Sequence, residues 1–108
     1  MKRYNVKVTP QAQYQMMEIR DYIAYQLVNP DAAKNTIRAI RDAVQKLDSM
    51  PDRVKPIEEE PWGSQGVRKI LVNNYYAYFW IDMKAFIVHV IAVAYAGRDQ
   101  KNVLNEIK

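Results

Sequence analysis

The chain has 108 residues, 49% of them hydrophobic and 26% charged, values typical of one globular domain spanning residues 1–108 around a single core. It contains no cysteine, which excludes disulfides and thiolate chemistry. Its formal net charge of +4 favours anionic partners such as nucleic acid, the ribosome or an acidic protein.

The first elements in chain order are a short strand and a helix. Residues 3–8 alternate apolar and polar side chains, which predicts a half-buried strand. Thr9 and Pro10 then give the sequence signal of an N-cap followed by proline at the first helical position. We expect this helix to end near Val28. Its apolar stripe at helical spacing consists of Ala12, Met16, Ile19, Ile23 and Leu27.

A second helix follows almost at once, because Asn29 and Pro30 repeat the cap-and-proline signal. It stops at Met50, before Pro51. Two amphipathic helices joined by so short a turn predict an antiparallel hairpin, with charges of both signs on its solvated outer faces. The apolar seam of the second helix consists of Ala33, Ile37, Ile40, Val44 and Leu47.

The last part of the chain predicts a loop and then a sheet. Prolines keep residues 51–65 irregular, and a loop of this length is either functional or merely mobile. The last strand is apolar on both faces, which is typical of a central strand. Gly97 ends it, and a short C-terminal helix is expected to open at Asp99 or Asn102. The predicted strands are residues 67–73, 75–82 and 86–95, joined by tight turns.

The order of these elements predicts an α+β fold. An N-terminal strand precedes an antiparallel helical hairpin, which packs on an antiparallel sheet of three further strands, and a short helix closes the chain. No stretch approaches the roughly 20 apolar residues of a membrane span. The charged N-terminus has no apolar segment behind it, as a secretory signal would. We therefore expect a cytoplasmic protein.

Signatures of a metal or cofactor site are missing from the sequence. His89 is the only histidine, and its place in the predicted central strand favours a satisfied core or groove residue over a catalyst. Glu58, Glu59 and Glu60 lie on the loop without the spacing of metal ligands. The three glycines are isolated, so no phosphate-binding loop is evident. We expect neither a metal nor a cofactor.

Cations and phenols remain as candidates for chemistry. Arg68 begins one predicted strand, and Tyr95 and Arg98 end the last one. If these strands are antiparallel neighbours, the three side chains meet at one edge of the sheet. Arginine suits a phosphate clamp because its planar fork donates paired hydrogen bonds, and tyrosine can act as a general acid or stack on a base. The alternative is structural: Arg98 pairs with Asp99, and Arg68 braces the carboxylates of the loop.

An aromatic series in residues 75–80 offers a second candidate surface. Alternation places Tyr75 on one face of its strand and Tyr76, Tyr78 and Trp80 on the other. Such a series is suited to stacking on single-stranded nucleic acid. Packing of the helical hairpin against the sheet must bury one of these faces, so we interpret most of the aromatic residues as core.

Three motifs in order resemble the RelE/ParE family of toxins from type II toxin–antitoxin systems, over nearly the whole chain. The helical part resembles the family's hairpin in the sequence EIRDYIAYQLVNPDAAKNTIRAIRDAVQKLDSMP. The sheet part is similar to the family's strand pair in GVRKILVNNYYAYFWID. The ending VAYAGRDQKNVL is similar to the family's closing motif, in which an arginine and an aspartate follow a histidine or tyrosine.

This resemblance implies a toxin that a cognate antitoxin inactivates by wrapping around it in a hetero-oligomer. RelE-like members are ribosome-dependent endoribonucleases that cleave mRNA in the ribosomal A site. ParE-like members poison DNA gyrase and have no nuclease chemistry. We place mRNA cleavage first, gyrase poisoning second, and a non-catalytic binding module with a basic edge third.

On the nuclease interpretation, the resemblance also implies roles for single residues. Arg68 matches the arginine that contacts the scissile phosphate, and Tyr95 and Arg98 match positions that serve acid–base work and transition-state charge. The RNA 2′-hydroxyl would attack the phosphate, so the protein needs no nucleophile of its own. A convincing general base is absent from the sequence. The predicted RNA contacts are Lys55, Lys69 and Tyr75.

Overall fold

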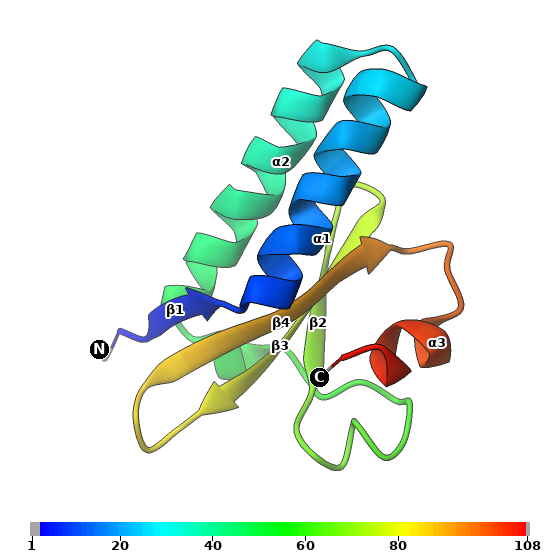
Figure 1. Cartoon of the computed structure of the whole chain (residues 1–108). Coiled ribbons are helices and arrows are strands. Elements are labelled where there is room, and N and C mark those ends of the chain that lie inside the picture. The colour runs from blue at the N-terminus through cyan, green and yellow to red at the C-terminus, as the bar shows by residue number, and fades with distance from the viewer. Residues whose placement is uncertain (1–2, 108) are drawn as a thin grey trace.

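The computed structural model describes residues 3–107. Four strands form one sheet in the order β1-β4-β3-β2, with the helical hairpin on one face and the short last helix against the other (Figure 1). The α+β class and the order of elements agree with the sequence prediction. The elements are β1 (Asn5–Val8), α1 (Pro10–Asp21), α2 (Pro30–Gln45), β2 (Arg68–Val72), β3 (Tyr75–Asp82), β4 (Ile87–Tyr95) and α3 (Gln100–Asn105).

The sheet is mixed, because the N-terminal strand joins it in parallel. β1 pairs with β4 in parallel, whereas β2, β3 and β4 form the predicted antiparallel set. β4 lies between β1 and β3, which confirms its prediction as a central strand. It begins at Ile87, one residue later than predicted, because Phe86 takes a positive φ of 56° in the turn before it. Asn73 takes a φ of 53° in the turn between β2 and β3, as expected of asparagine.

Both helices of the hairpin begin as their sequence signals predict. Thr9 Oγ1 accepts a hydrogen bond from the backbone N–H of Ala12 at 3.2 Å. Asn29 Oδ1 accepts one from the N–H of Ala32 at 3.0 Å. The proline after each cap lacks only an N–H that the first turn would leave unpaired. The cap residues therefore fix where each helix starts.

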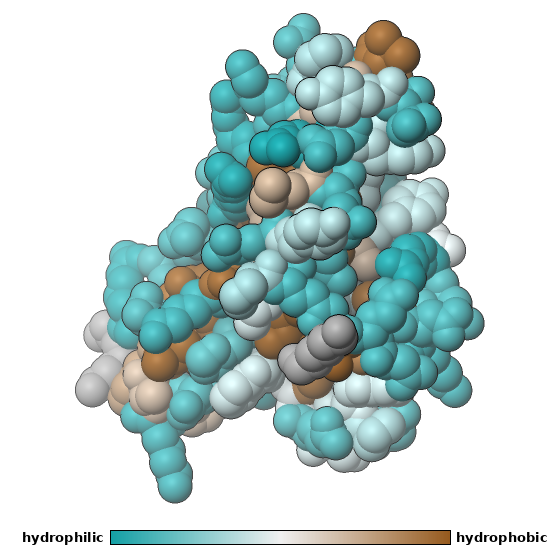
Figure 2. All heavy atoms as spheres, viewed as in Figure 1, coloured by the Kyte–Doolittle hydropathy of each residue, from teal (hydrophilic) through white to brown (hydrophobic). Residues whose placement is uncertain are grey.

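The connection between the two helices is tight and carries exposed apolar residues. α1 continues as a π-helical turn, Tyr22–Gln26. Val28 then takes a φ of 50°, a left-handed conformation that β-branched residues rarely adopt. Figure 2 shows the outer faces of the hairpin as mostly hydrophilic, with a hydrophobic residue at its tip. None of the helices in residues 3–107 is long and apolar enough to cross a membrane.

Two apolar clusters hold the layers together, one on each face of the sheet. The larger cluster joins the hairpin seams to the sheet, and its buried members include Met16, Ile40, Leu47, Phe79 and Val90. The smaller cluster packs α3 and the loop before β2 against the other face, and its buried members include Ile57, Tyr78, Ala92, Val103 and Leu104. Burial of both faces explains why β3 and β4 are apolar on both sides.

A β-bulge in β4 adjusts which side chains reach each face. Tyr78 pairs with Ala92 and Phe79 with Val90, so Ile91 is the extra residue. Ile91 and Ala92 consequently both contribute to the cluster beneath α3. The Tyr78 hydroxyl donates a hydrogen bond to Gln100 Oε1 at the start of α3. Burial raises the pKa of Tyr78 far above its usual range, so the phenol stays neutral and serves the core.

Candidate functional site

The predicted meeting of Arg68 with Tyr95 and Arg98 at one edge of the sheet is wrong. β2 and β4 are not neighbours, because β3 lies between them. Arg68 is opposite Phe79, which pairs with Val90, whereas Tyr95 lies at the far end of β4. The extended strand from Val90 to Tyr95 spans about 16 Å. Arg68 is therefore too far away to hold one phosphate together with Tyr95 and Arg98.

Arg68 instead braces the loop that precedes β2. Its Nη1 donates hydrogen bonds to the backbone carbonyl oxygens of Asp52, at 3.2 Å, and of Val54. Arg68 therefore has the structural role that was the alternative to phosphate binding. Its acceptors are backbone carbonyl groups of the loop and not the loop carboxylates. These two contacts attach the loop to the first residue of β2.

The two lysines predicted to contact RNA also lie away from the end of β4. Lys69 is on the sheet face opposite the hairpin. Its Nζ is 3.9 Å from Glu59 Oε2 and 4.1 Å from the centre of the Tyr76 ring. Lys55 is exposed on the loop, beside the residue that bridges to Arg68. The two predicted RNA-binding lysines thus lie on surfaces other than the one that holds Tyr95 and Arg98.

Three of the predicted residues do come together, in a groove of about 920 Å³ between α1, the ends of β3 and β4, and α3. We call it the tyrosine groove. Gln15 positions its helical wall, because Gln15 Oε1 accepts a hydrogen bond from the Val93 N–H of β4 at 2.8 Å. The groove is lined by Gln15, Glu18, Ile19, Tyr22, Leu27, Asn74, Tyr75, Val93, Ala94, Tyr95, Arg98 and Glu106.

Phenol rings form the floor of the tyrosine groove. Tyr75 and Tyr95 are opposite each other on β3 and β4, and their ring centres are 6.0 Å apart in an edge-to-face arrangement. Burial raises the pKa of Tyr75 above its usual range, and nearby Tyr22 and Tyr95 add to this shift. Tyr95 is 53% exposed. A Cβ at Gly97 would collide with the Tyr95 ring, so glycine at this position allows the ring to lie over the chain.

Arg98 lies at the rim of the tyrosine groove and is held by the last helix. Its Nη2 donates hydrogen bonds to Glu106 Oε1 and Oε2 at 2.9 and 3.2 Å. The alternative pairing with Asp99 is wrong, because Asp99 caps α3 by accepting a hydrogen bond from the Lys101 N–H at 3.0 Å. The side chains of Arg98 and Glu106 are about half exposed, so water screens the pair and a stronger anionic partner can replace Glu106.

The helical side of the groove was not among the predicted site residues. Glu18 and Tyr22 line it from the hairpin, whose outer faces the sequence assigns to solvent. A signal for them does exist: Tyr14, Glu18, Tyr22 and Tyr25 follow each other at spacings of four, four and three. This spacing makes a second, tyrosine-rich stripe on α1, outside the buried one. Tyr14, Tyr22 and Tyr25 are all more than half exposed.

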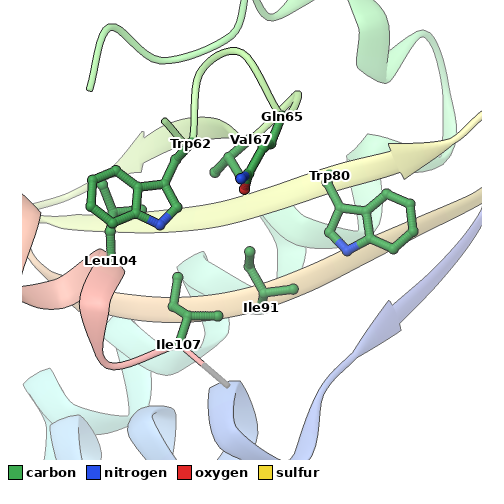
Figure 3. A pocket seen from close by; sticks show the side chains of 7 residues that line it. All are labelled: Trp62, Gln65, Val67, Trp80, Ile91, Leu104 and Ile107. Atoms are coloured by element: carbon green, nitrogen blue, oxygen red, sulfur yellow. The ribbon is translucent and has the colours of Figure 1, made fainter. Parts of the chain in front are cut away.

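A second pocket, of about 360 Å³, lies on the opposite face of the sheet beside α3 (Figure 3). We call it the tryptophan pocket. Its aromatic wall continues outside the pocket, because the Trp80 ring stacks on His89 with ring centres 4.5 Å apart and planes 18° from parallel. His89 is partly buried beneath this stack and lines neither the tryptophan pocket nor the tyrosine groove. The pocket is lined by Trp62, Gln65, Val67, Trp80, Ile91, Leu104 and Ile107.

The two sites differ in the titratable groups that they contain. The single histidine lies on the opposite face from Tyr95 and Arg98, so it is not available to them as a proton acceptor. The raised pKa of Tyr75 keeps its phenol protonated at neutral pH. In residues 3–107 no group of three or more His, Cys, Asp or Glu side chains is placed to hold a metal ion.

Comparison with known proteins gives a consistent family. The sequence matches the model of the ParE toxin of the type II toxin–antitoxin system parDE over residues 6–100. No curated protein sequence matches the chain significantly. The fold is similar to that of the chromosomal ParDE toxin–antitoxin system of P. aeruginosa, with a TM-score of 0.70 and 19% identity over 85% of this chain and 95% of that one.

Two further solved structures share the fold. The RelBE2 toxin–antitoxin complex of Mycobacterium tuberculosis has a TM-score of 0.61 and 21% identity, over 88% of this chain and 93% of that one. A mutant of the E. coli toxin RelE in the free state has a TM-score of 0.66 and 14% identity, over 97% of this chain and 94% of that one. At these identities the likeness concerns the fold alone.

Proposed function

The chain belongs to the ParE toxin family of type II toxin–antitoxin systems, and we propose that it arrests growth by poisoning DNA gyrase, without nuclease chemistry. ParE-like members act on gyrase, whereas RelE-like members cut mRNA. The observation that carries the choice is the match to the ParE toxin model over residues 6–100. The separation of Arg68 from Tyr95 and Arg98, by the width of β3 and about 16 Å of strand, agrees with it.

The contacts of Arg68 support the same choice. Its guanidinium is engaged by the backbone carbonyls of Asp52 and Val54. Attack by an RNA 2′-hydroxyl also needs a proton acceptor of suitable pKa within hydrogen-bond reach. The tyrosine groove lacks an imidazole, and of its two carboxylates, Glu18 and Glu106, the second is bound by Arg98.

The composition of the tyrosine groove supports a protein as its ligand. Tyrosine and arginine are enriched in the energetically important centres of protein interfaces, because they combine apolar area with a polar tip. Tyr22 is 56% exposed and Tyr95 53% exposed in the free chain. A protein docked here would bury both rings and place a carboxylate within reach of Arg98.

A cognate antitoxin is the second protein partner that we propose. Both the P. aeruginosa ParDE system and the M. tuberculosis RelBE2 complex are toxin–antitoxin assemblies of this fold. An antitoxin that covers the tyrosine groove would exclude gyrase by direct competition. Neutralisation of the toxin then requires no change in its structure.

The proposal is tested by expressing the chain in cells without its antitoxin. We expect a DNA damage response and intact transcripts, because the target is gyrase. Tyr95→Ala is expected to relieve growth arrest, and Leu71→Ala, a matched control on the exposed edge strand β2, is expected to remain toxic. Transcripts cut at ribosomal A sites without DNA damage would overturn the gyrase proposal.

Messenger RNA cleavage remains the second candidate, on one specific observation. Tyr95 and Arg98 line the same open groove, so a phenol and a guanidinium can face one phosphate there even without Arg68. The transcript assay above separates the two candidates in the same culture. The third alternative, a non-catalytic binding module without toxic action, predicts normal growth on expression.

A further inference from the structure

The tryptophan pocket is separate from the tyrosine groove, and the two share no lining residue. It lies on the sheet face that the hairpin leaves uncovered, bounded on one side by α3 and on another by the loop before β2. Figure 3 shows the indole rings of Trp62 and Trp80 at opposite ends of the pocket, with Ile91 and Ile107 between them. A flat ring that enters the pocket would therefore meet an aromatic surface at either end.

Trp80 is partly exposed, although the aromatic residues beside it are buried in the core. Tyr78 and Phe79 are fully buried, whereas Trp80 is 38% exposed. Its ring is held flat by the stack on His89, so it is already ordered before any ligand arrives. A preordered aromatic ring loses little conformational entropy on binding. This arrangement distinguishes a stacking site from a tryptophan that merely covers a core.

A cation lies in line with this stack. Lys7 of β1 is opposite His89, and His89 is opposite Trp80, so the three side chains form a row across β1, β4 and β3 on one face. Lys7 forms no ion pair with any residue in the described part of the chain. Aromatic surface beside an unpaired cation is the combination with which proteins bind single strands: bases stack on the rings, and the phosphate meets the charge.

We propose that the tryptophan pocket binds a base of single-stranded nucleic acid, with Lys7 on the adjoining phosphate. The pocket volume of about 360 Å³ accommodates one planar base. Gln65 lines the pocket, and its side-chain amide offers both a donor and an acceptor to the edge of the base. The net charge of +4 favours the same ligand. This binding is independent of the gyrase proposal, which concerns the other face of the sheet.

Trp62 and Trp80 are the only two tryptophans in the chain, so intrinsic tryptophan fluorescence reports on this pocket alone. Titration with a single-stranded oligonucleotide of eight nucleotides is expected to quench the emission, with a dissociation constant of about 1–100 μM at physiological salt. Inorganic phosphate and a duplex of the same length are expected to leave the emission unchanged. Quenching by phosphate alone, or equal quenching by the duplex, would overturn the assignment to a stacked base.

Variants assign the binding to the pocket. Trp80→Leu retains Trp62 as the reporter and is expected to weaken binding about tenfold, the loss typical of one base stack. Lys7→Gln is expected to reduce the dependence of log K on log salt by about 0.7. Lys46→Gln, at the end of α2, removes the same charge elsewhere and should leave that slope unchanged.

The outcomes that contradict the proposal are equally direct. If Lys7→Gln and Lys46→Gln changed the salt dependence of binding equally, the role of Lys7 would be non-specific electrostatic attraction, which contradicts the proposal. Unchanged emission at a saturating concentration of the oligonucleotide would overturn the proposal. Circular dichroism of each variant confirms that the fold is kept, since Trp80 and Lys7 are not part of the buried clusters.

Discussion

At the scale of single residues, Arg68 gives a prediction that bears on the choice between the two proposed targets. Its guanidinium holds the loop through the carbonyls of Asp52 and Val54. Arg68→Ala is expected to lower the free energy of unfolding by about 1–3 kcal/mol, because two charge-assisted hydrogen bonds are lost. Growth arrest at a permissive temperature should remain. Thermal unfolding measures the stability, and plating efficiency measures the growth arrest. A variant that is stable but no longer toxic would show that Arg68 acts in the toxic function.

Glu60 gives a prediction for pH dependence. Hydrogen bonds from the Ser64 hydroxyl and the Ser64 N–H lower the pKa of Glu60 below its usual value of 4.5. A lowered carboxyl pKa adds stability that is fully present above pH 4.5 and is lost as the pH falls through the folded-state value. In Ser64→Ala the Glu60 titration, followed by NMR, should move back towards pH 4.5. An unchanged midpoint would show that the hydroxyl contributes nothing.

At the scale of elements, local patterns in the sequence predict the helices and strands well. The pairs Thr9–Pro10 and Asn29–Pro30 mark both helix starts, because capping and a missing N–H are properties of adjacent residues. The sequence also carried a signal for strand order. Tight turns after Val72 and Asp82 make a meander, in which the middle strand separates the outer two. Arg68 and Tyr95 therefore had to lie two strands apart.

The rest of the site depends on contacts that local patterns do not encode. The tyrosine groove forms only when α1 lies over the end of β4, where Gln15 bonds to the Val93 N–H. Pairing of β1 with β4 joins residues about eighty positions apart, and no periodicity specifies it. The exposed stripe on α1 was readable at helical spacing. The sequence could not show that this stripe lines a groove, because the groove also needs side chains from the neighbouring sheet.

The helix connection carries a strained residue that a substitution can relieve. Val28 has a φ of 50° and is 79% exposed, so it stores backbone strain without contributing much to the core. Val28→Gly is expected to raise the free energy of unfolding by about 1 kcal/mol, because glycine adopts this conformation freely. Chemical denaturation measures the change. A loss of stability would mean that the Val28 side chain makes a stabilising contact at the hairpin tip.

At the scale of the whole molecule, the sheet separates the two proposed binding surfaces. The tyrosine groove lies on the hairpin side and brings together Tyr75, Tyr95 and Arg98. The tryptophan pocket lies on the opposite side and is flanked by Lys7. Because the two share no lining residue, gyrase and a single strand could occupy the molecule together. Tyr95→Ala should accordingly leave oligonucleotide binding unchanged, and Trp80→Leu should leave the inhibition of gyrase unchanged.

The most direct measurement is the supercoiling and cleavage activity of purified gyrase in the presence of the purified chain. We expect supercoiling to be inhibited and linear, gyrase-linked DNA to accumulate with increasing toxin. Tyr95→Ala should shift this dose response to at least tenfold higher concentration, as expected of a lost interface anchor worth about 1.4 kcal/mol or more. Leu71→Ala should behave as the unsubstituted chain. Unaffected gyrase at saturating toxin, with A-site cleavage of mRNA by the same preparation, would contradict the gyrase proposal.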